Sequence, residues 1–114
     1  MYTLKRTQLL PVAQQTAWKF FSDPRNLPVI TPPDLGFEIT SQLPEQMYAG
    51  MVVTYRVTAL AGVRVDWVTE ITHVRESDFF VDEQRFGPYR FWHHQHLFRA
   101  VEGGTEMVDQ VSYL

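Results

Sequence analysis

Three of the four histidines in this 114-residue sequence lie within four positions of one another, in the stretch RFGPYRFWHHQHLF from Arg85 to Phe98. If the stretch is a β-strand, successive side chains point to opposite faces, so His94 and His96 share one face and His93 lies on the other. Two residues separated by one position on a strand have Cα atoms about 6.6 Å apart, close enough for both imidazoles to approach one metal ion.

A metal ion needs a third and usually a fourth ligand, and Asp82 or Asp109 on flanking predicted strands would have to supply them. An H-x-H pair on a strand is a weak signal by itself, so we expect no metal and no cofactor. The simplest interpretation is that each histidine hydrogen-bonds across strands to a carboxylate or amide, in a half-buried wall. A further interpretation joins His94 and His96 with Asp82, Gln84 and Asp109 in a polar cluster that orients a ligand or transfers protons.

Aromatic and β-branched side chains share the predicted faces with these polar residues. Trp92 and Phe98 alternate in phase with His94 and His96, and a similar apolar stripe runs along the strand predicted over residues 63–74. Aromatic residues make up 14% of the sequence, and such large, rigid side chains can wall a cavity as well as fill a core. The residues expected to contact a ligand are Tyr55, Trp67, Thr69, Asp82, Gln84, Trp92, His94, His96, Phe98 and Asp109.

The composition argues against several classes of protein. The net charge is −3, and the ten Lys and Arg residues are spread along the chain, so nucleic acid is not an expected partner. The sequence has no cysteine, which excludes disulfides, thiolate metal sites and cysteine nucleophiles. No signal-peptide pattern and no run of eighteen apolar residues occurs, so we expect a cytoplasmic protein without stable membrane insertion.

The pattern of the whole chain predicts one domain over residues 1–114. A strand is predicted over residues 2–10, followed by an amphipathic helix with Pro11 in its first turn that ends near Ser22. The proline-rich segment 23–34 can hold only a short helical turn, at residues 23–27. Six further strands are predicted over residues 35–43, 51–60, 63–74, 79–86, 89–101 and 105–114. This order indicates an α+β fold in which a curved antiparallel sheet of about seven strands carries the N-terminal helices on one face.

Four stretches, spread over essentially the whole chain, resemble the ligand-binding SRPBCC proteins, the START and Bet v 1-like helix-grip superfamily. They read DPRNLPVITPPDLGFEI, VDWVTEIT, FVDEQRFGPYRFWHHQHLF and VEGGTEMVDQVSYL. Within that superfamily the sequence looks like the bacterial branch described as cell-division-inhibitor-like or polyketide-cyclase-like. The resemblance implies a helix-grip fold in which a long C-terminal helix crosses the concave face of the sheet. We expect this C-terminal helix to be absent here, because the sequence stops after the last predicted strand.

The resemblance also implies a function, the binding of a small hydrophobic molecule such as a lipid, polyketide, quinone or aromatic compound. Our main hypothesis is a binding or carrier protein without catalysis. One alternative is a cyclase-, aromatase- or dehydratase-like enzyme with His94, His96 and Asp82 as acid and base. Another is a protein-interaction module that docks a polypeptide on the concave face. The short C-terminus leads to two further hypotheses: a homodimer or partner chain covers the place of the helix, or the cavity is open on that side.

Overall fold

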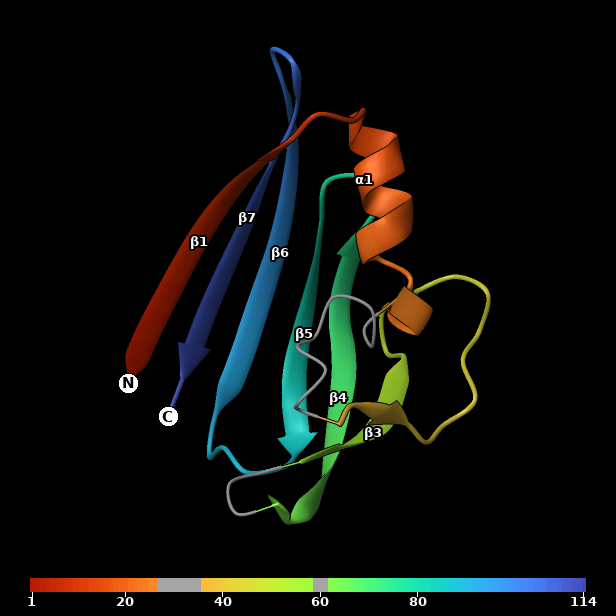
Figure 1. Cartoon of the computed structure of the whole chain (residues 1–114), viewed down its shortest axis with the longest axis vertical. Helices are drawn as coiled ribbons and strands as arrows, with labels where there is room; N and C mark the ends of the chain where they lie inside the picture. The colour runs from red at the N-terminus through yellow and green to blue at the C-terminus, as the bar shows by residue number, and fades with distance from the viewer. Residues whose placement is uncertain (27–35, 59–61) are drawn as a thin grey trace.

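The computed structural model describes residues 1–26, 36–58 and 62–114. Its elements in chain order are β1 (Tyr2–Leu10), α1 (Gln14–Phe21), the 3-10 helix η1 (Pro24–Asn26), β2 (Glu38–Ile39), β3 (Val52–Thr58), β4 (Arg64–Arg75), β5 (Phe79–Phe86), β6 (Trp92–Val101) and β7 (Gly104–Tyr113). The strands form one antiparallel sheet in the order β1-β7-β6-β5-β4-β3-β2 (Figure 1). The predicted seven-stranded antiparallel sheet is therefore confirmed.

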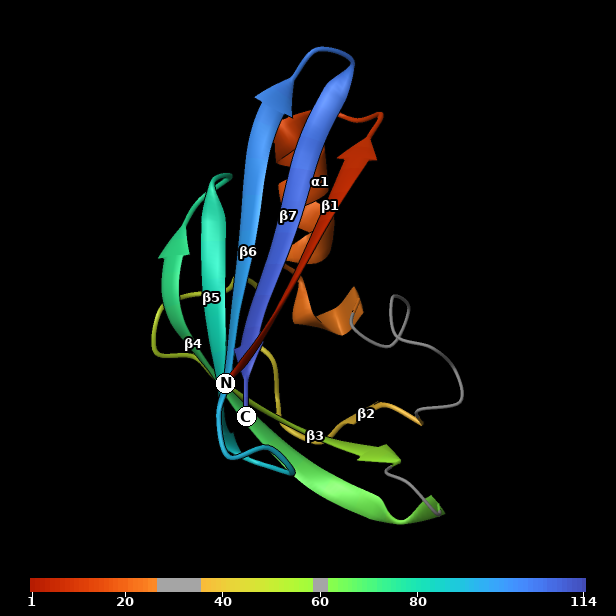
Figure 2. The same ribbon diagram turned by 90° about the vertical axis from the view of Figure 1, so that its left-hand side faces the viewer.

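The first and last strands of the chain lie side by side. Tyr2 is opposite Tyr113, and their rings stack with centroids 5.6 Å apart. Both ribbon views show the two ends of the chain close together (Figures 1 and 2). The same pairing places Arg6 opposite Asp109, and it makes β1 one edge of the sheet.

Helix α1 packs on one face of the sheet, which we call the concave face because the sheet bends toward α1 (Figure 2). The hydrophobic stripe of the helix carries Trp18, which is 6% exposed and meets Phe80 and Phe98 edge to face, at centroid distances of 5.8 and 5.4 Å. The Gln14 side chain donates hydrogen bonds to the carbonyl oxygens of Ser77, at 2.6 Å, and Phe98, at 3.3 Å. These contacts fix α1 over one end of the concave face.

A second apolar cluster lies on the concave face between β3 and β4. Met51, Val53 and Ile71 are its buried members. A register shift between Ile71 and His73 then allows Val74, rather than His73, to pack on the same cluster. The two clusters leave the middle of the concave face to other side chains, described below.

Some predicted elements are wrong in extent. The structure has one α-helix in its described part, not several, and the single helical turn η1 follows it. Helix α1 begins at Gln14 with Ala13 as its N-cap, so Pro11 lies outside it. Pro11 and Val12 instead turn the chain from β1 toward the helix, where Thr105 Oγ1 donates to the Val12 carbonyl at 2.8 Å.

The strand predicted over residues 35–43 is only the two-residue β2, paired with Arg56 and Tyr55 of β3. Backbone pairing continues only to Thr40, which donates to the Thr54 carbonyl, because the chain bends at Ser41 and the Ser41 hydroxyl accepts the Thr54 N–H in place of a backbone carbonyl. The helical turn predicted at residues 23–27 corresponds to η1. The rest of the predicted proline-rich connector, from residue 27 on, lies outside the described residues, and the strand predicted over 51–60 is described to Thr58. Among the described helices, none is long and apolar enough to cross a bilayer.

Candidate functional site

The strand register places all ten predicted ligand-contacting residues on the concave face. Residues directly opposite each other in neighbouring strands point to the same face. Tyr55 is opposite Trp67, Thr69 opposite Gln84, Asp82 opposite His94, and His96 opposite Asp109. Trp92 and Phe98 alternate in phase with the histidines, and Phe98 packs under α1. The role of these residues in binding stays a prediction, whereas their common face is a feature of the structure.

His93 lies on the opposite face, as the alternation along β6 predicts. Its Nδ1 is 3.1 Å from Glu83 Oε2 of β5. His93 and Glu83 thus form a histidine–carboxylate pair that is separated by the sheet from the concave face. This pair is a useful reference for experiments on the other histidines.

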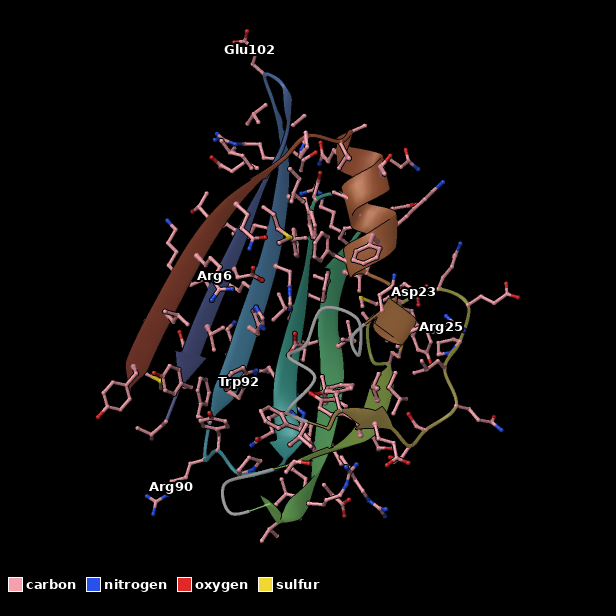
Figure 3. All side chains as sticks on the ribbon, in the orientation of Figure 1. Arg6, Asp23, Arg25, Arg90, Trp92 and Glu102 are labelled. Carbon is pink, nitrogen blue, oxygen red and sulfur yellow. The ribbon has the colours of Figure 1, made fainter. Side chains whose placement is uncertain are left out.

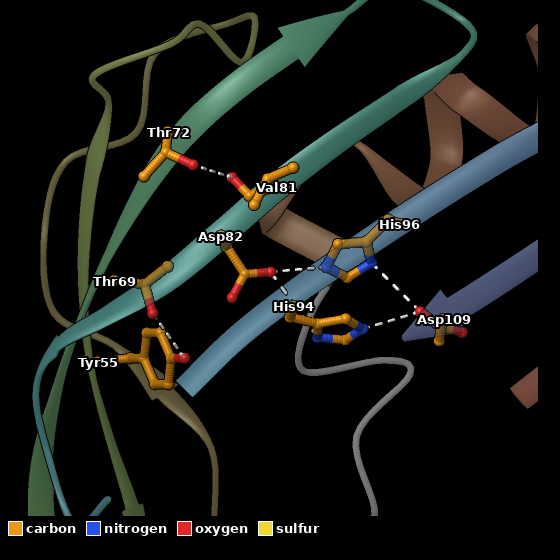
Figure 4. A network of polar contacts seen from close by, with 8 residues as sticks. All are labelled: Tyr55, Thr69, Thr72, Val81, Asp82, His94, His96 and Asp109. Carbon is orange, nitrogen blue, oxygen red and sulfur yellow. Dashed lines mark hydrogen bonds and ion pairs between the residues drawn. The ribbon is translucent and has the colours of Figure 1, made fainter. Parts of the chain in front are cut away.

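Two histidines and two carboxylates meet at the centre of the concave face, and we call Asp82, His94, His96 and Asp109 the polar cluster (Figure 4). His96 Nε2 is 2.6 Å from Asp82 Oδ2, and His96 Nδ1 is 3.3 Å from Asp109 Oδ1. His94 Nε2 is 3.0 Å from the same Asp109 oxygen, and His94 Nδ1 is 3.8 Å from Asp82 Oδ2. The four side chains are between 15% and 24% exposed, so the cluster is half-buried.

The environment favours the charged forms of Asp109 and His96. Burial raises the pKa of Asp109, but its hydrogen bonds to His94 and His96 outweigh burial, and the net pKa is lowered. Burial lowers the pKa of His96, but the carboxylates of Asp109 and Asp82 together outweigh it, and the net pKa is raised. An ionised Asp109 only accepts hydrogen bonds, so His94 Nε2 and His96 Nδ1 are the donors toward it.

The polar cluster has the geometry of the hydrogen-bonded wall that the sequence suggested as the simplest interpretation. Both nitrogens of His96 face carboxylate oxygens, and one nitrogen of His94 does so at hydrogen-bond distance. A general acid or base needs a nitrogen within reach of the substrate. In this arrangement His96 has no ring nitrogen directed away from the cluster.

An aromatic belt borders the polar cluster on the side away from α1, and it consists of Tyr55, Trp67, Tyr89, Trp92 and Tyr113. Trp67 is the centre of this belt, with ring centroids 5.8 Å from Tyr55, 5.7 Å from Tyr89 and 5.4 Å from Trp92. Tyr89 lies 4.8 Å from Trp92, which in turn lies 6.0 Å from Tyr113. Figure 3 shows Trp92 at the end of β6 that is distant from α1. The belt therefore crosses β3, β4, β6 and β7 within the sheet.

Two polar groups within the aromatic belt, the Tyr55 hydroxyl and the Trp67 Nε1–H, differ in their hydrogen bonding. The Tyr55 hydroxyl is 3.1 Å from Thr69 Oγ1. Burial raises the pKa of Tyr55, and the hydrogen bond to Thr69 opposes this shift only in part. The Trp67 Nε1 atom is buried and has no hydrogen-bond partner among the described residues. A buried donor of this kind carries a free-energy cost that an acceptor on a ligand would remove.

Three residues of this face were missed from the sequence. Tyr113 alternates in phase with Asp109, so periodicity was available to identify it. Tyr89 precedes β6 in a turn, where no periodicity exists to place it. Arg6 comes from the other end of the chain, and only the pairing of β1 with β7 brings it beside Asp109.

Two open hollows on the surface of the described residues lie elsewhere. One, of about 330 Å³, is formed by Leu9 to Pro11 and the β6–β7 hairpin. The other, of about 310 Å³, lies between Val65, Asp66 and residues 86–88. Neither hollow is lined by residues of the polar cluster or the aromatic belt. The chemistry on the concave face, and not the size of these hollows, identifies it as the candidate site.

No protein-family model matches the sequence, and no curated protein matches it either. Among solved structures, protein Ms6760 from Mycobacterium smegmatis is similar with 26% identity and a TM-score of 0.74, over 97% of this chain and 71% of that one. Protein CV1439 from Chromobacterium violaceum is similar with 13% identity and a TM-score of 0.79, over 98% of this chain and 79% of that one. Ginseng major latex-like protein 151 from Panax ginseng is similar with 15% identity and a TM-score of 0.74, over 98% of this chain and 78% of that one.

These similarities concern the arrangement of the elements, because the sequence identities are low. Each neighbour is longer than the part of it that this chain matches. Together with the antiparallel sheet and the helix packed on its concave face, they show that the chain has a Bet v 1-like helix-grip fold.

Proposed function

We propose that the concave face binds a small, largely apolar molecule, with the aromatic belt as its main contact surface. The observation that carries this proposal is the belt itself, five large rings from four strands and one turn on a single face. A belt made only for core packing would be covered by other elements. Instead Tyr89 is 37% exposed, and Trp67, Trp92 and Tyr113 are only partly buried. Partly exposed rings of this size contribute contact area at a small cost in conformational entropy.

The polar groups beside the belt limit the ligand to molecules that also have a hydrogen-bonding group. The Trp67 Nε1 donor lacks a partner among the described side chains, and the second oxygens of Asp82 and Asp109 lie beside those already bonded to histidine. A planar aromatic or polyketide-like molecule with carbonyl and hydroxyl groups satisfies such a surface better than a saturated lipid does. The ligand class that we favour is therefore a flat aromatic compound or polyketide.

The geometry favours binding over acid–base catalysis by His96. The carboxylates of Asp82 and Asp109 already engage both nitrogens of His96. Removing a proton from a substrate would first require breaking one of these charged hydrogen bonds. The cluster is accordingly a structural and orienting part of the site in this proposal. The hypothesis of a homodimer or partner chain on this face stays a prediction.

A direct test is a binding titration with the neutral fluorescent probe N-phenylnaphthylamine. We expect saturable binding of one probe per chain, and the variant Trp92→Ala should weaken it about tenfold, as expected for the loss of one large ring contact. Phe91→Ala is the matched control, because Phe91 is the preceding residue, is 38% exposed and packs near His93 on the other face. Equal weakening by both variants, or no saturable binding, would overturn the proposal. Thermal unfolding of both variants shows whether each remains folded.

A further inference from the structure

We propose that Asp82, His94 and His96 also form a binding site for one divalent transition-metal ion, through Asp82 Oδ2, His94 Nδ1 and His96 Nε2. Each of these three side chains can offer one ligand atom, a carboxylate oxygen or one of the two ring nitrogens, such that the three atoms lie within 4.8 Å of one another. Four tetrahedral ligands with bonds of about 2.1 Å stand about 3.4 Å from one another. The distance from Asp82 Oδ2 to His96 Nε2 is 2.6 Å, which is shorter than this ligand–ligand distance. The distance from Asp82 Oδ2 to His94 Nδ1 is 3.8 Å, which is longer.

The stronger argument is the position of Asp109 behind the two histidines. A metal-bound histidine usually donates its other ring N–H to a carboxylate, which fixes its tautomer and orientation. Asp109 Oδ1 is 3.0 Å from His94 Nε2 and 3.3 Å from His96 Nδ1. It therefore holds the nitrogens that would not bind the metal and turns the other two toward Asp82. The H-x-H spacing in the sequence does not show which two of the four ring nitrogens face Asp109 and which two face Asp82.

The surroundings restrict the rings further. Phe80 stacks on His96 with centroids 3.9 Å apart and 11° between the planes. His94 stacks on the other side of His96, at 3.7 Å and 25°. Metal binding requires the rings of His94 and His96 to rotate away from parallel stacking, so that the lone pairs of His94 Nδ1 and His96 Nε2 both point at one ion. Because the side chains of Asp82, His94 and His96 are 15–20% exposed, the ion would have an open coordination position toward the concave face.

The ligand set predicts which ions bind. Imidazole nitrogens with one carboxylate suit Zn²⁺, Fe²⁺ and Co²⁺, whereas Mg²⁺ and Ca²⁺ prefer sites made only of oxygen. The site does not depend on the apolar ligand, so the two proposals can fail separately. If both are correct, the ion lies beside the aromatic belt, where a ligand carbonyl or hydroxyl could occupy the open position.

The test is titration of the EDTA-treated full chain with Zn²⁺, followed by isothermal calorimetry and metal analysis after dialysis. We expect one Zn²⁺ per chain and no uptake of Mg²⁺ under the same conditions. Asp82→Asn and His94→Ala should abolish binding, and Asp109→Asn should weaken it about 10- to 100-fold. His93→Ala is the matched control, because His93 also pairs with a carboxylate but lies on the other face, and it should leave binding unchanged.

A measurement on the unmodified protein covers the case in which a variant fails to fold. Nitrogen NMR shifts of the imidazoles should show Zn²⁺ bound to His94 Nδ1 and His96 Nε2. Absence of stoichiometric Zn²⁺, coordination through His94 Nε2 or His96 Nδ1, or loss of binding in His93→Ala would each overturn the proposal.

Discussion

The imidazoles of His94 and His96 stack with ring centroids 3.7 Å apart, and one oxygen of Asp109 lies within 3.3 Å of a nitrogen of each ring. Stacked imidazoles on one strand accumulate positive charge when they are protonated. A carboxylate that contacts both rings offsets this charge and fixes their orientation. The polar cluster is therefore organised around Asp109, although Asp109 lies on a different strand from both histidines.

The first prediction concerns the contribution of Asp109 to stability. Asp109→Asn should lower the free energy of unfolding of the metal-free protein by about 2 kcal/mol, since it weakens two hydrogen bonds that histidine rings donate to an ionised carboxylate. The 24% exposure of the side chain keeps the expected loss below that of a fully buried pair. Urea unfolding at neutral pH with EDTA measures this change.

Glu106→Gln is the control for that experiment. Glu106 lies on the same strand but pairs with Arg99, whose side chain is 71% exposed, at 2.9 Å. Its loss should cost less than about 0.5 kcal/mol. Equal costs for the two substitutions would show that Asp109 has no special structural role.

The second prediction concerns the packing of α1. Trp18→Ala should lower the free energy of unfolding by about 3–5 kcal/mol, because it removes a buried ring that meets Phe80 and Phe98. Phe20 lies on the same helix but is 39% exposed, so Phe20→Ala should cost less than about 1 kcal/mol. Chemical denaturation of the two variants gives the comparison, and a Trp18→Ala protein as stable as Phe20→Ala would contradict the observed helix packing.

The third prediction is a loss of stability in alkaline solution that depends on Tyr55. Burial raises the pKa of Tyr55 in the folded state above the ordinary tyrosine value of about 10. The folded chain therefore holds this proton more tightly than the unfolded chain, and the resulting stability is complete below pH of about 10. It is lost as the pH rises above that value toward the folded-state pKa.

Urea unfolding of the wild type and Tyr55→Phe at several pH values from 9 upward tests this dependence. The wild type should lose stability more steeply than the variant, because phenylalanine has no proton to release. Parallel pH profiles would show that Tyr55 does not contribute the predicted linkage.

The strands of the sheet's second half could be predicted closely from the sequence, and the reason is local. Successive side chains of β4 alternate between a more buried and a more exposed face, and the buried residues of β7, Thr105, Met107 and Val111, share one face. In β5 and β6 burial does not alternate, and the two faces follow from strand geometry alone. The shared face of Asp82, His94, His96 and Asp109 followed from the same alternation. A register shift after Ile71 changed the face of the residues that follow in β4, and alternation alone could not locate it.

Other features depend on contacts that are distant in sequence. The pairing of β1 with β7 joins residues about 100 positions apart, and no local pattern encodes it. Helix α1 begins later than its apolar pattern suggested, because Pro11 and Val12 are needed for the turn out of β1. The choice of which histidine nitrogen faces which carboxylate depends on side-chain rotation, which strand alternation does not determine.

The most direct test of the proposed binding face uses the three tryptophans as internal reporters. Trp67 and Trp92 belong to the aromatic belt, whereas Trp18 belongs to α1 and packs in the core between this helix and the sheet. In indole N–H NMR spectra recorded during titration with N-phenylnaphthylamine, the resonances of Trp67 and Trp92 should shift progressively to saturation, and that of Trp18 should stay in place. Unchanged resonances of Trp67 and Trp92 at a saturating probe concentration, or a shift confined to Trp18, would contradict binding at the concave face.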